Sequence, residues 1–226
     1  MPIRHRTFGI CMDYTHVIWD FNGTVLCDME AGIRATNEML AARGLPQLSS
    51  LDAYREVFDF PVEDYYRRIG LDLEKEDFKT VLAPLWVSLY NMYSKTSPIY
   101  PGVREVVGAL RARGVRQSIL SASEREMMCA QLRERDAEDL FDEIWGTGSI
   151  HAYGKGALAD AWRAAHQADR VLLLGDTTHD FEVAERIGAD CILIANGHHS
   201  AARLVACGVP VLPDLAAFLQ LLNEKG

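Results

Sequence analysis

The sequence predicts an α/β protein with a doubly wound parallel sheet as its core and an all-helical cap domain inserted into that core. Three observations support this fold class. Short apolar runs recur along the chain, helical patterns alternate with them from residue 98 onward, and residues 28–97 contain helical patterns alone. Strand–helix alternation is typical of right-handed βαβ crossovers, so the core is expected to be Rossmann-like.

Four short apolar runs are the expected strands. All but the second are nearly unbroken in apolarity, which is typical of central strands that helices cover on both faces. The expected strands are residues 16–21, 115–120, 171–175 and 191–195. The helical patterns that alternate with them are residues 103–113, 124–134, 155–166, 180–187 and 214–223.

The interval between the first strand and Pro98 breaks the alternation. Helical periodicity covers residues 31–42, 63–69 and 74–93, and Pro84 is expected to kink or divide the last of these helices. We therefore predict a cap domain of residues 28–97 on a core domain of residues 1–27 and 98–226. An extra helical layer packed permanently on the core is the alternative.

Composition excludes several classes of protein. With 226 residues, 49% hydrophobic and 24% charged, the chain is globular rather than disordered. A net charge of −9 argues against a nucleic-acid-binding surface, which needs a basic face. No apolar run reaches 18 residues, so no membrane span is expected. The five cysteines form no CxxC pair, which indicates reduced thiols and a cytoplasmic location.

Polar residues follow the predicted strands at the edge where α/β proteins bind ligands. Asp20 lies at the end of the first strand, Ser121 follows the second and Asp176 follows the third, while Asp180 and Lys155 lie at the starts of helices. Two carboxylates brought close together repel one another unless a hard cation lies between them, and Mg²⁺ is the cation that prefers such oxygen ligands. Each residue alone has a common structural explanation, such as a helix cap or a turn, so their joint placement carries the prediction.

Four motifs, in this order, resemble those of the haloacid dehalogenase (HAD) superfamily of phosphotransferases. The segment DFNGT at residues 20–24 matches the first motif, DxDxT, except at its second aspartate. Ser121 matches the second motif, Lys155 the third, and the segment from Gly175 to Asp180 the fourth, GDxxxD. Residues 58–70 also resemble the helical C1-type cap of phosphoglycolate-phosphatase-like members.

The resemblance implies a phosphatase that acts on a small phosphorylated metabolite. Asp20 would be the nucleophile and would form an aspartyl-phosphate that water then hydrolyses. The implied Mg²⁺ ligands and their support are the carboxylates of Asp20 and Asp176, the main-chain carbonyl of Asn22, and Asp180. The implied phosphate-binding residues are Gly23, Thr24, Ser121, Ala122 and Lys155.

Asn22 departs from the family pattern. The aspartate normally found there protonates the leaving oxygen, and an amide cannot, so a loss of about 10²–10⁴-fold in rate is expected. Three alternatives remain: a phosphatase that is slow or suited to good leaving groups, a pseudo-phosphatase that binds phosphate and metal with little turnover, and a sugar-phosphate mutase.

Side chains from the cap are expected to contact the substrate, and those to inspect are Tyr65, Tyr66, Arg67 and Arg68. His198 and His199 follow the last predicted strand, where they could line the site or lie on a loop, and the loop is the expectation. The partners that we expect are a small phosphate ester and, at most, a second copy of the chain, so the protein is a monomer or a homodimer.

Overall fold

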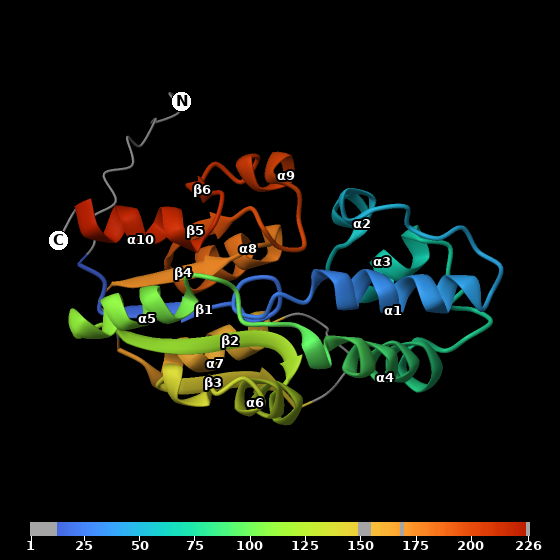
Figure 1. Ribbon diagram of the computed structural model, residues 1–226, viewed down its shortest axis with the longest axis horizontal. Helices are drawn as coiled ribbons and strands as arrows, with labels where there is room; N and C mark the ends of the chain where they lie inside the picture. The colour runs from blue at the N-terminus through green and yellow to red at the C-terminus, as the bar shows by residue number, and fades with distance from the viewer. Residues whose placement is uncertain (1–12, 149–154, 168–169, 225–226) are drawn as a thin grey trace.

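A computed structural model describes residues 13–148, 155–167 and 170–224. Its core is a six-stranded sheet in the order β3-β2-β1-β4-β5-β6, and all neighbouring strands are parallel (Figure 1). The strands are β1 (His16–Trp19), β2 (Arg116–Glu124), β3 (Glu143–Thr147), β4 (Val171–Gly175), β5 (Asp190–Ile194) and β6 (Val211–Leu212). The strand order reverses at β1, so the crevice beside this strand is where such sheets bind ligands.

The predicted fold class is confirmed, and the strands that were missed lie at the two edges of the sheet. All four predicted strands are present, and β2 extends to Glu124 through a register shift beyond Leu120. The sequence analysis missed β3 and β6. Every residue of β3 is only half-buried and β6 has two residues, so neither produces the continuous apolar run of a central strand.

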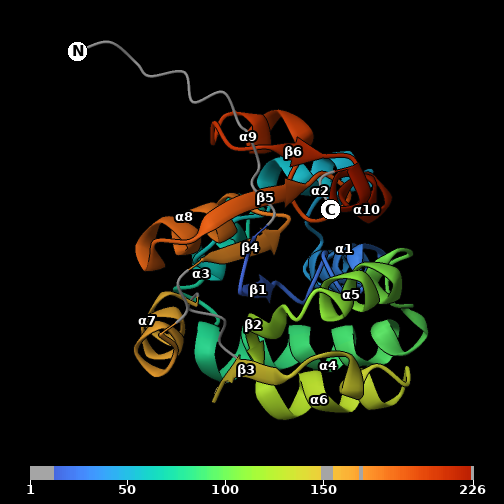
Figure 2. The same ribbon diagram turned by 90° about the vertical axis from the view of Figure 1, so that its left-hand side faces the viewer.

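Helices cover both faces of the sheet (Figure 2). One face packs against α5 (Val103–Ala112), α6 (Arg125–Arg133) and α10 (Leu215–Glu224). The other face packs against α7 (Gly156–Ala165), α8 (Thr178–Ile187) and α9 (Ala201–Val205). Five of these helices were predicted, with ends that differ by at most two residues, and α9 was missed. None of the helices in the described ranges has the length and apolarity needed to cross a membrane.

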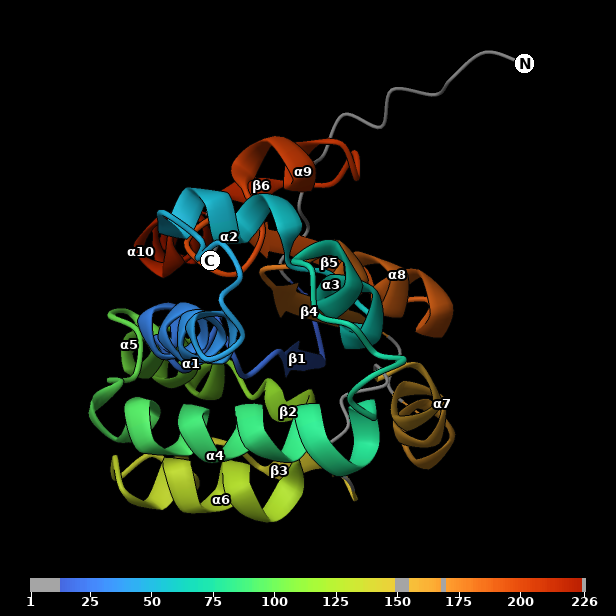
Figure 3. The ribbon, with the colours of Figure 1, turned by 90° about the vertical axis from the view of Figure 1, so that its right-hand side faces the viewer.

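A separate group of helices lies beyond the carboxyl ends of the strands (Figure 3). Its members are α1 (Met29–Ala41), α2 (Leu51–Val57), α3 (Val62–Arg68), a π-helical turn (Phe78–Leu82) and α4 (Ala83–Tyr93). They share an apolar core of their own, in which the buried side chains include Met39, Tyr54 and Tyr66. The structure thus confirms an all-helical insertion after the first strand.

Two details of the insertion differ from the prediction. The short helix α2 was missed, and the last helical segment begins at Phe78 rather than at residue 74, because Asp77 caps it with a 2.8 Å hydrogen bond from Thr80 N to its Oδ1. The division expected at Pro84 is confirmed, since α4 begins at Ala83 with the proline in its first turn.

Two connections join the helical group to the sheet, and they lie side by side. Cys27 N–H donates to Pro98 O at 2.9 Å, and Leu26 forms an antiparallel bridge with Ile99. These pairs lie at the boundaries that the sequence suggests for the cap. The assignment of residues 28–97 as an independent domain stays a prediction.

A buried histidine at the start of β1 makes stability depend on pH. His16 is 2% exposed, bonds to Ser118 Oγ at 2.8 Å, and has its pKa lowered to about 4 by burial and by the nearby His166 and Arg116. Its folded pKa lies below its unfolded value, so its stabilisation is complete above pH 6.5 and is lost as the pH falls toward 4. We expect the free energy of unfolding to fall by up to about 3 kcal/mol over this range.

Urea titrations at several pH values measure this effect, with His16→Gln as the variant that keeps a polar partner for Ser118 but does not titrate. The variant should lose less stability than the wild-type protein between pH 6.5 and 4. Equal slopes in the two proteins would show that folding does not lower the pKa of His16.

Candidate active site

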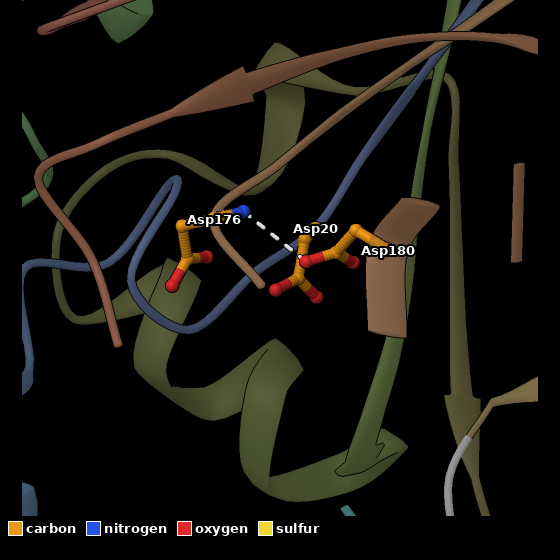
Figure 4. A group of neighbouring side chains, drawn as sticks. All are labelled: Asp20, Asp176 and Asp180. Carbon is orange, nitrogen blue, oxygen red and sulfur yellow. Dashed lines mark hydrogen bonds between the residues drawn. The ribbon is translucent and has the colours of Figure 1, made fainter. Parts of the chain in front are cut away.

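Three buried carboxyl groups meet at the carboxyl ends of the central strands. Asp20 directly follows β1, Asp176 directly follows β4, and Asp180 lies in the first turn of α8. One oxygen atom from each carboxylate lies within 4.8 Å of the others (Figure 4). The parallel register of β1 and β4 brings Asp20 and Asp176 together, as the sequence analysis expected.

Lys155 joins two of these carboxylates. It precedes α7, and its Nζ atom donates to Asp20 Oδ1 at 2.7 Å and also pairs with Asp180 Oδ1. The side chain of Lys155 is only 4% exposed, so these bonds form away from solvent. Lys155 therefore positions the Asp20 carboxylate. Residues 149–154, which precede Lys155 and include Gly154, lie outside the described residues.

A tight loop holds Asp176 and Asp180 in place. Asp180 Oδ2 accepts from Asp176 N at 3.1 Å and from Thr177 N at 2.9 Å, while the Thr177 hydroxyl completes a capping box. Asp176 Oδ1 accepts from Thr24 Oγ1 at 2.7 Å, and its Oδ2 accepts from His198 N at 2.6 Å. Both Asp176 oxygens are thus oriented by fixed donors.

Two glycines make room for Asp176. A Cβ atom at Gly23 would lie 2.3 Å from Asp176 Oδ2, and one at Gly197 would lie 2.1 Å from the same atom. Gly23 also has a φ of +77°, which favours glycine. The close approach of Asp176 and the positive φ therefore both require glycine at position 23.

The pKa values reflect crowding of negative charge. Burial, together with the charges of Asp180 and Asp176, raises the pKa of Asp20 well above its usual range despite Lys155. Burial and the charge of Asp180 raise the pKa of Asp176 to about 6, although His198 opposes this. Burial also acts to raise the pKa of Asp180, but Lys155 and Thr177 outweigh it and hold that pKa low.

The residues present fit a divalent cation. Three buried carboxylates face one ammonium group, so the site carries an excess of negative charge that its own side chains do not balance. All the atoms available as ligands are oxygens, and these are the ligand atoms that Mg²⁺ prefers. The role of Asp20, Asp176 and the Asn22 carbonyl as metal ligands, with Asp180 in support, stays a prediction.

A cavity of about 100 Å³ opens above Asp20, between the strand ends and the cap helices. Of the predicted phosphate-binding residues, Ser121, Ala122 and Lys155 line it. Gly23 and Thr24 do not line it. The Gly23 N–H donates within its own turn to Leu26 O and to Asp28 Oδ1, and the Thr24 hydroxyl bonds to Asp176. These bonds give both residues a part in building the site, and their contact with phosphate stays a prediction.

Asn22 is held at both ends of its amide. Its Nδ2 donates to Asp28 Oδ2 at 2.7 Å and to Tyr90 OH at 2.8 Å, and its Oδ1 accepts from Ser123 Oγ at 2.5 Å. Asn22 was predicted from the sequence, whereas Asp28 and Tyr90 were missed. Asp28 precedes α1 in the position of a helix cap, yet it makes no capping bond and turns its carboxylate to the Asn22-Gly23 turn instead.

His198 lies on the loop after β5, as expected, and it also lines the site, which was the alternative. Its ring lines the cavity, its Nε2 lies 3.5 Å from Asp28 Oδ1, and its Nδ1 is hydrogen bonded to Tyr54 OH at 2.8 Å. Burial acts to lower the pKa of His198, but Asp28 outweighs it and raises that pKa; His198 in turn holds the pKa of Asp28 low. The two form a buried ion pair where the cap meets the core.

The four cap side chains expected near the substrate divide into two pairs. Tyr65 and Tyr66 are buried and line the cavity. Arg67 and Arg68 are exposed and outside it, where they pair with carboxylates of the cap. The predicted contact with Arg67 and Arg68 is therefore not supported by their position.

Relatives that match most of this chain are named as phosphatases. The chain is 23% identical over 212 residues to a phosphoglycolate phosphatase of Synechococcus elongatus, covering 92% of this chain and 97% of that protein. It is 26% identical over 195 residues to a phosphoglycolate phosphatase of Nitrosospira multiformis, covering 81% and 84%. It is also 26% identical over 207 residues to the probable phosphatase IndB of Dickeya dadantii, covering 88% of each.

Solved structures share the fold, and a family model matches most of the chain. A haloacid dehalogenase-like family hydrolase from Streptococcus pneumoniae superposes with a TM-score of 0.78 at 17% identity, covering 92% of this chain and 98% of that one. Protein Tyrosine Kinase A of Mycobacterium tuberculosis gives 0.75 at 20%, with the same coverage. The model of haloacid dehalogenase-like hydrolases matches residues 17–194. The chain therefore belongs to the haloacid dehalogenase-like hydrolase family.

Proposed function

We propose that the protein is a Mg²⁺-dependent phosphatase that hydrolyses a small phosphate monoester through an aspartyl-phosphate on Asp20. The observation that carries this proposal is the Asp20 carboxylate, which lies at the floor of a cavity, bonded to Lys155 at 2.7 Å and beside Asp176 and Asp180. A carboxylate buried in this way but exposed to a cavity is suited to nucleophilic attack on phosphorus.

The side chains around Asp20 perform the remaining steps. Lys155 and Ser121 bind the oxygens of the transferred phosphoryl group, and fixed donors of this kind supply most of the catalysis in phosphoryl transfer. Bound Mg²⁺ supplies positive charge that offsets the charge of the carboxylates and the phosphate. Asp180 keeps Lys155 in position through its own ion pair.

Asn22 leaves the site without a side chain for acid–base catalysis. Its amide has no proton to give to a leaving oxygen and no basicity to activate water, so both steps proceed without a positioned acid or base at this place. The alternative function is that of a binding protein, which would hold phosphate and metal without turnover. The bonds that fix this amide to Asp28, Tyr90 and Ser123 favour this alternative.

Hydrolysis of 4-nitrophenyl phosphate with Mg²⁺ separates the two functions. An enzyme releases 4-nitrophenolate at a rate proportional to its concentration, and this release requires Asp20. If the wild-type protein and Asn22→Asp are both inert while inorganic phosphate still binds, the protein is a binding protein.

Removal of one carboxylate should affect stability in opposite directions with and without metal. In Asp176→Asn the amide keeps partners in Thr24 and His198 N. It removes a carboxylate whose burial and whose repulsion by Asp180 raise the pKa of Asp176. Without metal, we expect the variant to be more stable than the wild-type protein by about 1–2 kcal/mol at pH 7.5. At 100 times the dissociation constant, Mg²⁺ should stabilise only the wild-type protein, by about 2.7 kcal/mol.

Thermal unfolding with EDTA and with MgCl₂ measures both effects. The exposed Asp139→Asn is the matched control, and it should follow the wild-type protein in both conditions. A variant at Asp176 that Mg²⁺ stabilises as much as the wild-type protein would exclude this carboxylate as a ligand.

A further inference from the structure

The cavity above Asp20 changes from polar at its floor to aromatic at its roof. The floor, at the strand ends, is formed by Asp20, Asn22, Ser121, Ser123 and Lys155. The cap contributes the aromatic side chains Tyr54, Phe58, Phe60, Tyr65, Tyr66, Phe78, Trp86 and Tyr90. A phosphate ester bound to the floor therefore places its leaving group against these rings.

The rings offer carbon surfaces to that leaving group, because the polar atoms of several are bonded to the protein. These bonds are Tyr54 OH with His198 Nδ1 at 2.8 Å, Tyr65 OH to Thr36 Oγ1 at 3.1 Å, Tyr90 OH to Asp28 Oδ2 at 2.6 Å and Trp86 Nε1 to Thr36 Oγ1 at 3.2 Å. Aromatic surfaces of this kind favour another flat ring, through stacked or edge-to-face contacts.

A second anionic group on the leaving group would have no cation to meet it. Among the described residues that line the cavity, the only basic side chains are Lys155 and His198. Lys155 bonds to Asp20 and Asp180, and His198 pairs with Asp28. A carboxylate held against the cap rings would lose its hydration without gaining a partner, which is strongly unfavourable.

Asn22 points to the same class of substrate independently. With no positioned acid beside it, the leaving oxygen departs as an anion, and this favours an oxygen whose conjugate acid is strong. A phenolic hydroxyl, with a pKa near 10 as in tyrosine, is a far stronger acid than an aliphatic alcohol.

We propose, on the basis of the phosphatase function above, that the substrate is the phosphate monoester of a single-ring phenol. The ring of this phenol binds among the aromatic side chains of the cap. The volume sets an upper limit on this size. The cavity measures about 100 Å³, less than the apolar cavity of about 150 Å³ that holds one benzene ring, so it admits at most one ring. A nucleotide or another multi-ring ester is too large for it.

The reaction balances without a protein acid. An oxygen of the Asp20 carboxylate forms a bond to phosphorus, the bond from phosphorus to the aryl oxygen breaks, and the aryl oxide leaves with the electron pair and takes a proton from water. A second water then attacks phosphorus, releases a proton to solvent and restores the Asp20 carboxylate, giving inorganic phosphate.

Turnover of three esters tests the aryl assignment. We expect kcat/KM for phenyl phosphate to exceed that for 2-phosphoglycolate by at least about 100-fold, and to exceed that for benzyl phosphate, whose leaving group is an aliphatic alcohol. Equal or faster turnover of 2-phosphoglycolate or benzyl phosphate would overturn the aryl assignment and leave the phosphatase function intact.

Binding of two phosphonates tests ring recognition separately from catalysis. In the presence of Mg²⁺, phenylphosphonate should bind the wild-type protein at least about tenfold more tightly than phosphonoacetate, which carries a carboxylate. Tighter binding of phenylphosphonate without any turnover would support the aryl site and reject the phosphatase function. Equal affinities, or tighter binding of phosphonoacetate, would overturn the aryl site.

A charge placed in the cavity provides a matched pair of variants. Val87 lines the cavity from α4, whereas Val81 lies on the same segment of the cap, is 41% exposed and does not line it. Val87→Arg should weaken phenylphosphonate binding and strengthen phosphonoacetate binding, and Val81→Arg should change neither. Identical behaviour of the two variants would overturn the placement of the ring beside α4.

Discussion

Asp20→Asn is expected to abolish hydrolysis of 4-nitrophenyl phosphate, with a loss on the order of 10⁴-fold or more. The variant keeps the shape of the side chain and an oxygen that accepts the 2.7 Å hydrogen bond from Lys155. An amide oxygen is a far weaker nucleophile toward phosphorus than a carboxylate, so the aspartyl-phosphate does not form. Initial rates at saturating Mg²⁺, measured on freshly purified protein, give the loss directly.

The same variant should be more stable than the wild-type protein when Mg²⁺ is absent. Burial and the charges of Asp180 and Asp176 raise the pKa of Asp20, so its ionised form destabilises the metal-free protein at neutral pH. A loss of activity together with a gain in stability excludes unfolding as the cause. Asp139→Asn, an exposed change of the same kind, is the control for activity. If Asp20→Asn keeps activity within tenfold of the wild-type value, Asp20 is not the nucleophile.

The central part of the fold was predictable because burial on both faces makes a strand uniformly apolar. Each residue of β1 and β4 is buried, and these strands stood out in the sequence. The edge strand β3 is half-buried along its length and contains Gly146, so its sequence resembles that of a loop. The carboxylates and Lys155 were predictable because each follows from the position of its own strand or helix along the chain.

The second half of the site was not predictable because it forms between elements far apart in sequence. Asp28 and His198 pair although they lie 170 positions apart in the sequence, and Tyr90 reaches Asp28 from another helix. Periodicity assigns a residue to its own helix face or loop, but it does not say which loop that face meets. The aromatic residues of the cap were visible in the sequence. Their arrangement around one cavity depends on the docking of the cap on the sheet.

Reversal of the Asn22–Asp28 pair should restore the missing acid and base. Asn22→Asp alone places two carboxyl groups at the 2.7 Å separation now spanned by a hydrogen bond, so they must share a proton. The double variant Asn22→Asp/Asp28→Asn exchanges the two groups. Its carboxyl group is at position 22, beside Asp20, and its amide is at position 28. We expect kcat of the double variant for 4-nitrophenyl phosphate to rise by about 10²-fold, within the 10²–10⁴-fold range of a positioned acid or base.

Pre-steady-state kinetics identify the step that Asn22 limits. Because 4-nitrophenolate leaves without a proton, the aspartyl-phosphate of the wild-type protein should form quickly and hydrolyse slowly, giving a burst of about one product per active site. The double variant, which has a base for the attacking water, should show a faster steady state and no burst. Asp28→Asn alone supplies no such base and should gain no activity, and mass spectrometry of Asn22 excludes deamidation as a source of wild-type turnover. The opposite outcome is that the wild-type protein shows no burst and the double variant is no faster. This would show that the lack of a carboxylate at position 22 does not limit turnover.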